Sequence, residues 1–203
     1  MSIVVVDYGM GNLRSVSKAL EHVAPGVEVA VTADPDKIFS CERLVVPGQG
    51  AMPDCMRNLE ASGAREAVLE AMRAKPYLGI CLGLQMLFER AEEGPTPGLA
   101  LLPGDVPRFR VQGLKIPHMG WNEVFQAKPH PLWQGIADAS RFYFVHSYYP
   151  APGDPGVAAG TCMYGAPFTC AVARDNIFAV QFHPEKSQSA GLQLLSNFVR
   201  WRP

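Results

Sequence analysis

The sequence predicts a single α/β domain over residues 1–203, with a mostly parallel central sheet flanked by helices and antiparallel strand additions in the C-terminal half. The first half alternates short apolar runs with segments of helical periodicity, which is typical of a parallel sheet covered by helices. The second half holds short apolar runs separated by turn residues. The chain has 203 residues and is 48% hydrophobic, so it can bury a substantial core, and its length favours one domain.

The first half opens with a strand, a turn and a helix. Residues 2–6 are an apolar run, and residues 12–22 carry Leu13, Val16 and Leu20 at helical spacing. We expect further strands at 27–31, 44–46 and 77–80, and helices at 54–74, broken near Ser62 and Gly63, and at 82–90. Pro, Gly and Asp punctuate these segments as turn residues do. Crossovers of this kind place helices on both faces of a sheet.

The second half predicts antiparallel strands and one closing helix. Strand-like runs lie at 99–102, 123–125, 141–146, 157–164, 168–174 and 177–182. Residues 189–201 have helical periodicity. We find no internal repeat that would divide the chain.

Composition excludes several classes of function. The 18 Lys and Arg residues face 19 Asp and Glu residues, and no basic block favours binding to nucleic acid or to a membrane surface. The N-terminal apolar run lacks the length and the basic flank of a signal segment, and no stretch approaches the roughly 18 apolar residues of a membrane span. We therefore expect a cytoplasmic protein whose ligand is a small molecule or another protein.

The cysteine pattern directs attention to one thiol. The five cysteines are an odd number and form no CxxC pair, so neither a disulfide framework nor a zinc site is indicated. Cys81 stands between Gly79 and Gly83, where a strand gives way to a helical pattern, and this is the pattern of a nucleophile elbow. A helix start stabilises a thiolate and can bind an oxyanion. From the residues alone, a buried structural role for Cys81 is equally compatible, and we expect that role for Cys41, Cys55, Cys162 and Cys170.

A thiol nucleophile needs a base and a group that orients the base. Of the five histidines, His22 and His130 are expected in solvent. His183 follows a strand and precedes Pro184 and Glu185, so strand alternation would put the imidazole and the carboxylate on the same side. The alternative is a surface His and Glu beside a turn.

Together, the two patterns are more specific than either. Gly79-x-Cys81-x-Gly83-x-Gln85 followed by His183-x-Glu185 resembles the class I (triad) glutamine amidotransferases. Within that family, the segments 7–15, 47–50, 115–122, 143–148 and 183–187 resemble the glutaminase subunits of imidazole glycerol phosphate synthases. The resemblance implies that Cys81, His183 and Glu185 hydrolyse glutamine to glutamate and ammonia.

The resemblance also implies how substrate and oxyanion are held. It assigns glutamine binding to Gln85, Glu93, Ser147 and Tyr148. It assigns the oxyanion to backbone N–H groups of Leu82 and of the turn at Gly48 and Gln49. Gln49 departs from the small apolar residue common at this position, which puts the ease of rearrangement of the turn in doubt. From the sequence alone, Glu93 would be an ordinary exposed acid at a helix end.

A second protein follows from the chemistry of ammonia, which is mostly protonated in water near neutral pH and then cannot act as a nucleophile. The resemblance implies a (β/α)8-barrel cyclase as partner, which uses the ammonia to make imidazole glycerol phosphate and aminoimidazole carboxamide ribonucleotide in histidine biosynthesis. It implies docking through Asn12, Trp121, Tyr143 and Lys186. Without the resemblance, we would expect Trp121 to be buried and structural.

One alternative fails on the residues, and two stay open. Gly9-x-Gly11 after the first strand suggests a dinucleotide site, but Arg14 stands where the third glycine belongs, so we expect no nucleotide, no cofactor and no metal. A γ-glutamyl hydrolase, or the glutaminase of another synthase, would share the triad. A non-enzymatic regulatory subunit would dock without catalysis.

Overall fold

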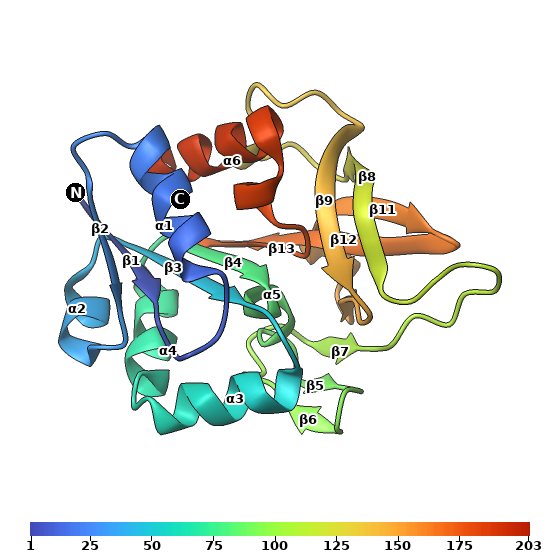
Figure 1. Ribbon diagram of the computed structural model, residues 1–203, viewed down its shortest axis with the longest axis horizontal. Coiled ribbons are helices and arrows are strands. Elements are labelled where there is room, and N and C mark those ends of the chain that lie inside the picture. Colours follow the sequence, from blue (N-terminus) through green and yellow to red (C-terminus); the bar gives the residue numbers. More distant parts are fainter.

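The computed structural model describes all 203 residues. Its main sheet has nine strands in the order β2-β1-β3-β4-β13-β12-β11-β8-β9 (Figure 1). The parallel strands are β1 (Ser2–Val6), β2 (Glu28–Thr32), β3 (Arg43–Gly48), β4 (Tyr77–Cys81) and β13 (Ile177–Val180). The antiparallel strands are β12 (Ala166–Arg174), β11 (Ala158–Tyr164), β8 (His118–Gln126) and β9 (Ser140–His146). The predicted parallel sheet with antiparallel additions is confirmed.

Helices cover both faces of the parallel strands, as Figure 1 shows. One layer consists of α1 (Leu13–Val23) and α6 (Gln188–Arg200), and the other of α2 (Pro35–Ser40), α3 (Met52–Ala61) and α4 (Arg65–Ala74). Each layer closes its own apolar core. Val16 and Phe198 belong to the first core, whereas Ile38 and Leu59 belong to the second. Strand side chains alternate between the two cores, since successive residues point to opposite faces.

Short elements complete the chain. A small sheet joins β5 (Arg90–Ala91), β6 (Thr96–Pro97), β7 (Gly104–Val106) and β10 (Ala151–Pro152) in the order β10-β7-β5-β6. Single 3-10 turns are η1 (Pro131–Trp133), η2 (Pro155–Val157) and η3 (Pro184–Lys186). None of the helices is both long and apolar enough to cross a membrane.

Two predicted elements are wrong, and one cause explains both. The helix expected at 82–90 ends after one turn as α5 (Leu82–Gln85), and residues 99–102 form no strand. The carbonyl oxygen of Met86 accepts the N–H of Leu99, and that of Leu87 accepts those of Leu101 and Leu102. These long-range hydrogen bonds replace the continuation of the helix and remove the backbone donors that a strand would need.

Other boundaries differ less. Helices α3 and α4 break at Gly63, which has φ 72°, close to the predicted interruption. Strand β8 covers 118–126 rather than 123–125 and pairs residue for residue with β9, His118 opposite His146 and Trp121 opposite Tyr143. This pairing brings two separate motifs of the sequence side by side.

Candidate active site

Cys81 lies in a sharp turn between β4 and α5, at the carboxyl ends of the parallel strands. Its backbone has φ 57° and ψ −106°, a conformation that residues with a side chain rarely adopt. Strain of this kind in a buried turn is typical of functional positions, because the surrounding structure must hold it. The strand-to-helix elbow predicted from the sequence is confirmed.

Two glycines make the turn possible. A Cβ on Gly83 would lie 1.8 Å from the carbonyl oxygen of Val46 in β3, and a Cβ on Gly79 would lie 2.4 Å from the carbonyl oxygen of Gly83. Any larger residue would push α5 away from the strands beneath it. The glycines therefore set the position of the thiol.

His183 and Glu185 lie beside this elbow. The Nδ1 atom of His183 is 2.9 Å from Oε1 of Glu185, and the side chains are 3% and 1% exposed. The predicted proximity is confirmed, but the expected strand alternation is wrong. Strand β13 ends at Val180, and the two residues flank the start of the 3-10 turn η3, which folds the carboxylate back onto the ring.

The backbone around His183 is clamped to β9. Its N–H donates to the carbonyl oxygen of Tyr143 at 2.9 Å, and its own carbonyl accepts the Ser187 hydroxyl at 2.6 Å. The same hydroxyl accepts the N–H of Tyr143 at 3.0 Å. These bonds hold the imidazole in one place relative to the thiol.

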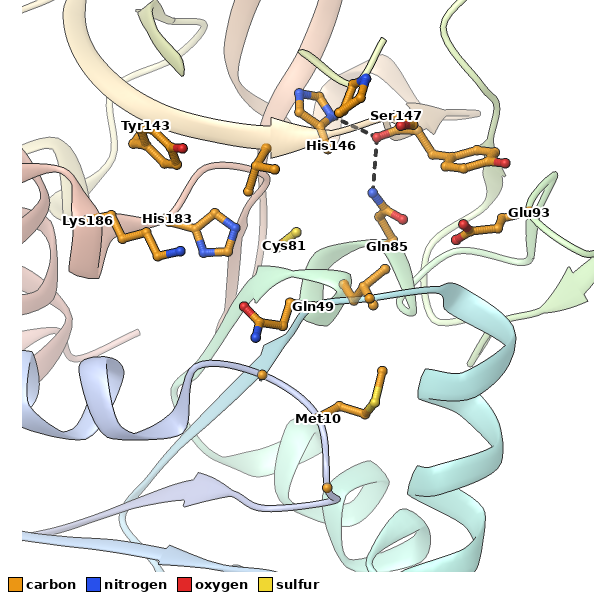
Figure 2. Close-up of a pocket in the computed structure, with 17 residues that line it drawn as sticks. Met10, Gln49, Cys81, Gln85, Glu93, Tyr143, His146, Ser147, His183 and Lys186 are labelled. Atoms are coloured by element: carbon orange, nitrogen blue, oxygen red, sulfur yellow. Dashed lines mark hydrogen bonds between the residues drawn. The ribbon is translucent and has the colours of Figure 1, made fainter. Parts of the chain in front are cut away.

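The electrostatics favour a charged imidazole. Burial by itself lowers the pKa of His183, but the neighbouring Cys81 sulfur and Glu185 carboxylate outweigh it and raise the pKa to about 10. The His183 ring is directed toward Cys81 (Figure 2), and its Nε2 atom is buried without a hydrogen-bond partner in the chain. A proton on Nε2 is thus free to move to a reacting group.

A cavity of about 760 Å³ opens at the thiol (Figure 2). Its walls come from the loop after β1, the turn after β3, the elbow, the end of β9 and η3. The predicted site residues that line it are Cys81, His183, Gln85, Glu93, Ser147, Tyr148, Gln49, Leu82, Tyr143 and Lys186, whereas Glu185, Gly48, Asn12 and Trp121 stand outside it. The tertiary structure therefore gathers almost all of the predicted residues around one cavity.

The predicted substrate residues occupy defined places in this cavity. The Gln85 side-chain amide donates to the carbonyl oxygen of Tyr148 at 3.1 Å. Glu93 is half-buried, and its Oε2 accepts the N–H of Met52 at 2.8 Å, at the start of α3. Ser147 accepts the N–H of Phe109 through its carbonyl at 3.0 Å. Glu93 is therefore no ordinary exposed acid.

Comparison with known proteins identifies the family. Residues 4–201 match the family model of class-I glutamine amidotransferases. The chain belongs to the class-I glutamine amidotransferase family. It is 64% identical over 210 residues to the imidazole glycerol phosphate synthase subunit HisH of Dechloromonas aromatica, covering 100% of this chain and 97% of the relative. It is 61% identical over 209 residues to HisH of Aromatoleum aromaticum, covering 99% of each.

Solved structures share the amidotransferase fold at low sequence identity. PurLQS from Thermotoga maritima matches with a TM-score of 0.74 at 21% identity, covering 98% of this chain and 97% of that one. The crystal structure of another glutamine amidotransferase matches with a TM-score of 0.70 at 19% identity, covering 97% of each chain. These likenesses confirm the fold class.

The expected oxyanion turn of this amidotransferase lies beside the elbow. Gly48 ends β3 and pairs with Cys81 in the sheet, and a Cβ there would lie 2.5 Å from the Tyr8 hydroxyl and 2.7 Å from Cβ of Leu82. Gln49 and Gly50 are exposed at the cavity. Only glycine at 48 lets the turn approach the start of α5 this closely.

Three of the four expected docking residues, Trp121, Tyr143 and Lys186, contact one another beside the cavity. The rings of Trp121 and Tyr143 are 6.2 Å apart, and Nζ of Lys186 lies 5.8 Å from the centre of the Tyr143 ring. Asn12 follows Gly11, which lines the same cavity. Trp121 is 37% exposed, so the buried position expected from the residues alone is wrong.

Sequence analysis missed two buried residues of the site. Gln181 donates from Nε2 to the Cys81 sulfur at 3.6 Å, and its Oε1 accepts a hydrogen bond from Gln85 at 3.0 Å. His146 binds the Tyr148 carbonyl through Nδ1 at 2.8 Å. The position of Gln181 two residues before His183 was the available signal. For His146 the signal was its place in the segment 143–148, but its buried partner His118 comes from a distant strand.

The remaining cysteines and histidines have structural surroundings. Cys41, Cys55, Cys162 and Cys170 are buried, as predicted. His130, expected in solvent, is half-buried with its ring 4.7 Å from that of Phe178. Burial, with a smaller effect of Lys128, lowers its pKa to about 4.

Proposed function

We propose that this chain is the glutaminase subunit of an imidazole glycerol phosphate synthase, which works in the cytoplasm, hydrolyses glutamine and passes ammonia to a cyclase subunit. The carrying observation is the strained Cys81 elbow facing the buried His183–Glu185 pair at the wall of one cavity. The high identity to HisH subunits over the whole chain points to the same synthase.

The first half of the reaction forms a thioester. The Cys81 thiolate attacks the side-chain amide carbon of glutamine, and the carbonyl oxygen takes up the negative charge. His183 then gives the proton on Nε2 to the leaving nitrogen, the C–N bond breaks and ammonia departs. Glu185 stabilises the imidazolium and fixes its orientation through Nδ1, as the carboxylate of other triads does.

The second half returns the enzyme to its starting state. Neutral His183 accepts a proton from water through Nε2, and the hydroxide attacks the thioester carbon. The C–S bond breaks and restores the thiolate beside the imidazolium, and the new carboxylic acid gives its proton to solvent and leaves as glutamate. The pKa of about 10 for His183 fits a resting state with the proton on the ring.

The oxyanion is assigned to backbone N–H groups of Leu82 and of the Gly48–Gln49 turn. Loss of one such donor costs about 2.7 to 4 kcal/mol of transition-state stabilisation in comparable sites. Gly48 and Gly50 flank Gln49, and Gly50 has φ 101°, so the turn has the conformational freedom to reorient an N–H toward the reacting carbonyl. The Gln49 side chain itself takes no part.

Glutamine recognition is assigned to four residues. The Glu93 carboxylate binds the ammonium group by charge, the Ser147–Tyr148 backbone contacts the amino-acid end, and the Gln85 amide reaches the bound glutamine. All of these residues lie on the cavity wall. Their arrangement puts the substrate amide at the thiol.

The partner is assigned to the face formed by β8 and the cavity mouth, where the (β/α)8-barrel cyclase would cover the outlet. Met119, on the same strand as the exposed Trp121, is 62% exposed, and Met163 on the neighbouring strand β11 is 55% exposed. Exposed Met and Trp are typical of protein interfaces. A docked cyclase there would receive ammonia before water protonates it.

The test is glutamate release from glutamine by the chain alone and with the cyclase, each with and without the acceptor nucleotide. Turnover that requires the cyclase and disappears in Cys81→Ala supports the proposal. High turnover by the isolated chain, indifferent to the cyclase, would point instead to a free-standing hydrolase or another synthase. Absence of turnover and of Cys81 alkylation under every condition would favour a non-enzymatic subunit.

A further inference from the structure

A continuous series of hydrogen bonds runs from strand β8 to the nucleophile. Asn122 Nδ2 lies 3.2 Å from His118 Nε2, and His118 Nδ1 lies 2.8 Å from His146 Nε2. His146 Nδ1 lies 2.8 Å from the Tyr148 carbonyl, which also accepts from Gln85 (Figure 2). Gln85 donates in turn to Gln181 Oε1, and Gln181 Nε2 lies 3.6 Å from the Cys81 sulfur. We call this series the relay, and its members are Asn122, His118, His146, the Tyr148 carbonyl, Gln85 and Gln181.

The outer end of the relay determines the direction of the bonds that join Asn122, His118 and His146. The Asn122 amide nitrogen donates to the Met163 carbonyl at 2.8 Å, and its oxygen accepts the N–H of Glu123 at 2.8 Å, so the amide cannot turn over. His118 Nε2 must therefore accept, which places its proton on Nδ1. The same reasoning makes His146 Nε2 an acceptor and its Nδ1 a donor to Tyr148.

An aromatic enclosure keeps water away from the two imidazoles. Phe144 and Tyr164 stack on His118 with centroids 4.8 and 4.1 Å away, and Phe109 contacts His146 at 5.1 Å. Burial lowers the pKa of His118 to about 4 and that of His146 to about 3. Both rings are therefore neutral, and each has one donor and one acceptor.

The inner end reaches the glutamine subsite through the Tyr148 carbonyl, which the His146 N–H holds in place and which can only accept. Since the Tyr148 carbonyl and Gln181 Oε1 are both acceptors, the NH2 group of Gln85 must face them. Gln85 Oε1 accepts no bond within the chain and remains available to the cavity. A reversed amide would set its oxygen against two other oxygens.

We propose that the relay positions Gln85 and Gln181. Asn122 and His118 fix the tautomer of His146, and its Nδ1–H holds the Tyr148 carbonyl, which orients the Gln85 amide toward glutamine and, through it, the Gln181 amide toward the Cys81 sulfur. Asn122, His118 and His146 are positioning residues, because none of them touches the reacting atoms. Trp121 and Asn122 are adjacent, so the relay also joins the docking face to the substrate subsite. The consequence for glutamine rests on the proposed glutaminase function, whereas the proton order of the relay does not.

Asn122→Asp is the sharpest variant, since it keeps the shape and removes the donor. A carboxylate favours a proton on His118 Nε2, which reverses both imidazoles and leaves His146 Nδ1 unprotonated against the Tyr148 carbonyl. His146→Phe interrupts the relay with an apolar ring. Glu123→Gln is the matched control on the same strand, since Glu123 is exposed, and His130→Phe removes a half-buried imidazole that lies outside the relay.

The first readout is long-range 1H–15N NMR of the histidine rings in the full chain. We expect His118 and His146 as neutral tautomers protonated on Nδ1, reversed to Nε2 in Asn122→Asp and unchanged in the two controls. Any other wild-type tautomer overturns the relay, whether or not the chain hydrolyses glutamine.

The second readout is the ratio of Cys81 alkylation rates by a glutamine-like chloroketone and by iodoacetamide. We expect this ratio to fall about five- to tenfold in Asn122→Asp and His146→Phe, as for loss of one well-placed hydrogen bond. In the complex with the cyclase, KM for glutamine should rise by the same factor while kcat changes less. An unchanged ratio in both relay variants overturns the positioning role. No selective alkylation of the wild type would instead count against the proposed function.

Discussion

The imidazole of His183 and the carboxylate of Glu185 form a buried pair, with Nδ1 and Oε1 2.9 Å apart. Because Nδ1 is bonded to Glu185, Nε2 is the nitrogen of His183 that is available for proton transfer. Because the turn η3 and the hydroxyl of Ser187 hold both residues, the geometry exists before substrate arrives.

Replacement of Glu185 by Gln should lower glutaminase activity by about 10² to 10⁴ while the chain still folds, because the imidazolium loses its counter-charge and its orientation. Steady-state glutamate release with the cyclase measures this. The control is Glu123→Gln, which removes an exposed carboxylate. Activity within a factor of two of the wild type would contradict the triad.

The same pair predicts how stability depends on pH. The pKa of His183 is raised to about 10 from 6.5, with Cys81 and Glu185 facing the ring and with Lys186, Tyr143 and His146 lining the same cavity. A raised pKa contributes stability that is fully present below about pH 6.5 and is lost as pH rises toward 10. Urea unfolding should therefore show that Glu185→Gln has a lower free energy of unfolding than the wild type, and that this difference shrinks between pH 6.5 and 10. A difference that grows over this range would contradict the assignment.

His118 and His146 predict the opposite slope in acid. Their pKa values are lowered by burial to about 4 and about 3, and they face each other, with His183 near His146. Such groups stabilise the fold above about pH 6.5, and that stability is lost as pH falls toward the lowered pKa. At pH 5 each of the two histidines should lower the free energy of unfolding by about 2 kcal/mol, since one pKa unit is about 1.4 kcal/mol. Urea unfolding of the wild type and His146→Phe at pH 7.5 and 5 tests this, with exposed His22→Ala as control.

Gly83→Ala should cost about 3 kcal/mol or more and abolish activity, because its Cβ would lie 1.8 Å from the Val46 carbonyl oxygen. Gly153→Ala is a matched control, as its Cβ would meet Pro103 only at 3.4 Å and beyond. Urea unfolding midpoints compare the two. Equal stability of both variants would mean that the elbow can relax.

Two substitutions of Gln49 distinguish a role of its side chain from a role of its backbone N–H group. Gln49→Ala should keep activity within about threefold, because the proposed donor is a backbone N–H of this turn. Gln49→Pro removes one N–H and should lower kcat by about 10² to 10³. A large loss in Gln49→Ala would give the side chain a part in catalysis.

Trp121→Ala should weaken cyclase binding by about 2 kcal/mol, because exposed Trp residues often dominate interfaces. Calorimetric titration with the cyclase measures the affinity, and iodoacetamide alkylation of Cys81 checks that the elbow is intact. Phe39→Ala on α2 is the control. Phe39 is 58% exposed, and α2 follows β2, which is at the other end of the main sheet from β8 and β9. Equal losses in both variants would place the docking face elsewhere.

The sequence by itself determined the alternation of elements, the Gly-flanked turn around Cys81 and the nearness of His183 to Glu185. These features depend on local periodicity and on residues one or two positions apart, which the chain carries within short segments. The resemblance extended this to residues such as Glu93 and Tyr148, whose meeting at one cavity no local pattern contains.

Only the tertiary structure decided where α5 ends, how the Glu185 carboxylate comes to lie against the His183 imidazole, and which groups orient the Gln85 amide. The helix stops at Gln85 because carbonyls of Met86 and Leu87 bind N–H groups more than ten residues further on. His118 and His146 meet because β8 and β9 pair in one register, and burial among aromatic rings from several segments, such as Phe109 and Phe144, lowers the pKa of His146. Long-range hydrogen bonds and burial arise from packing, so a pattern read along the chain does not contain them.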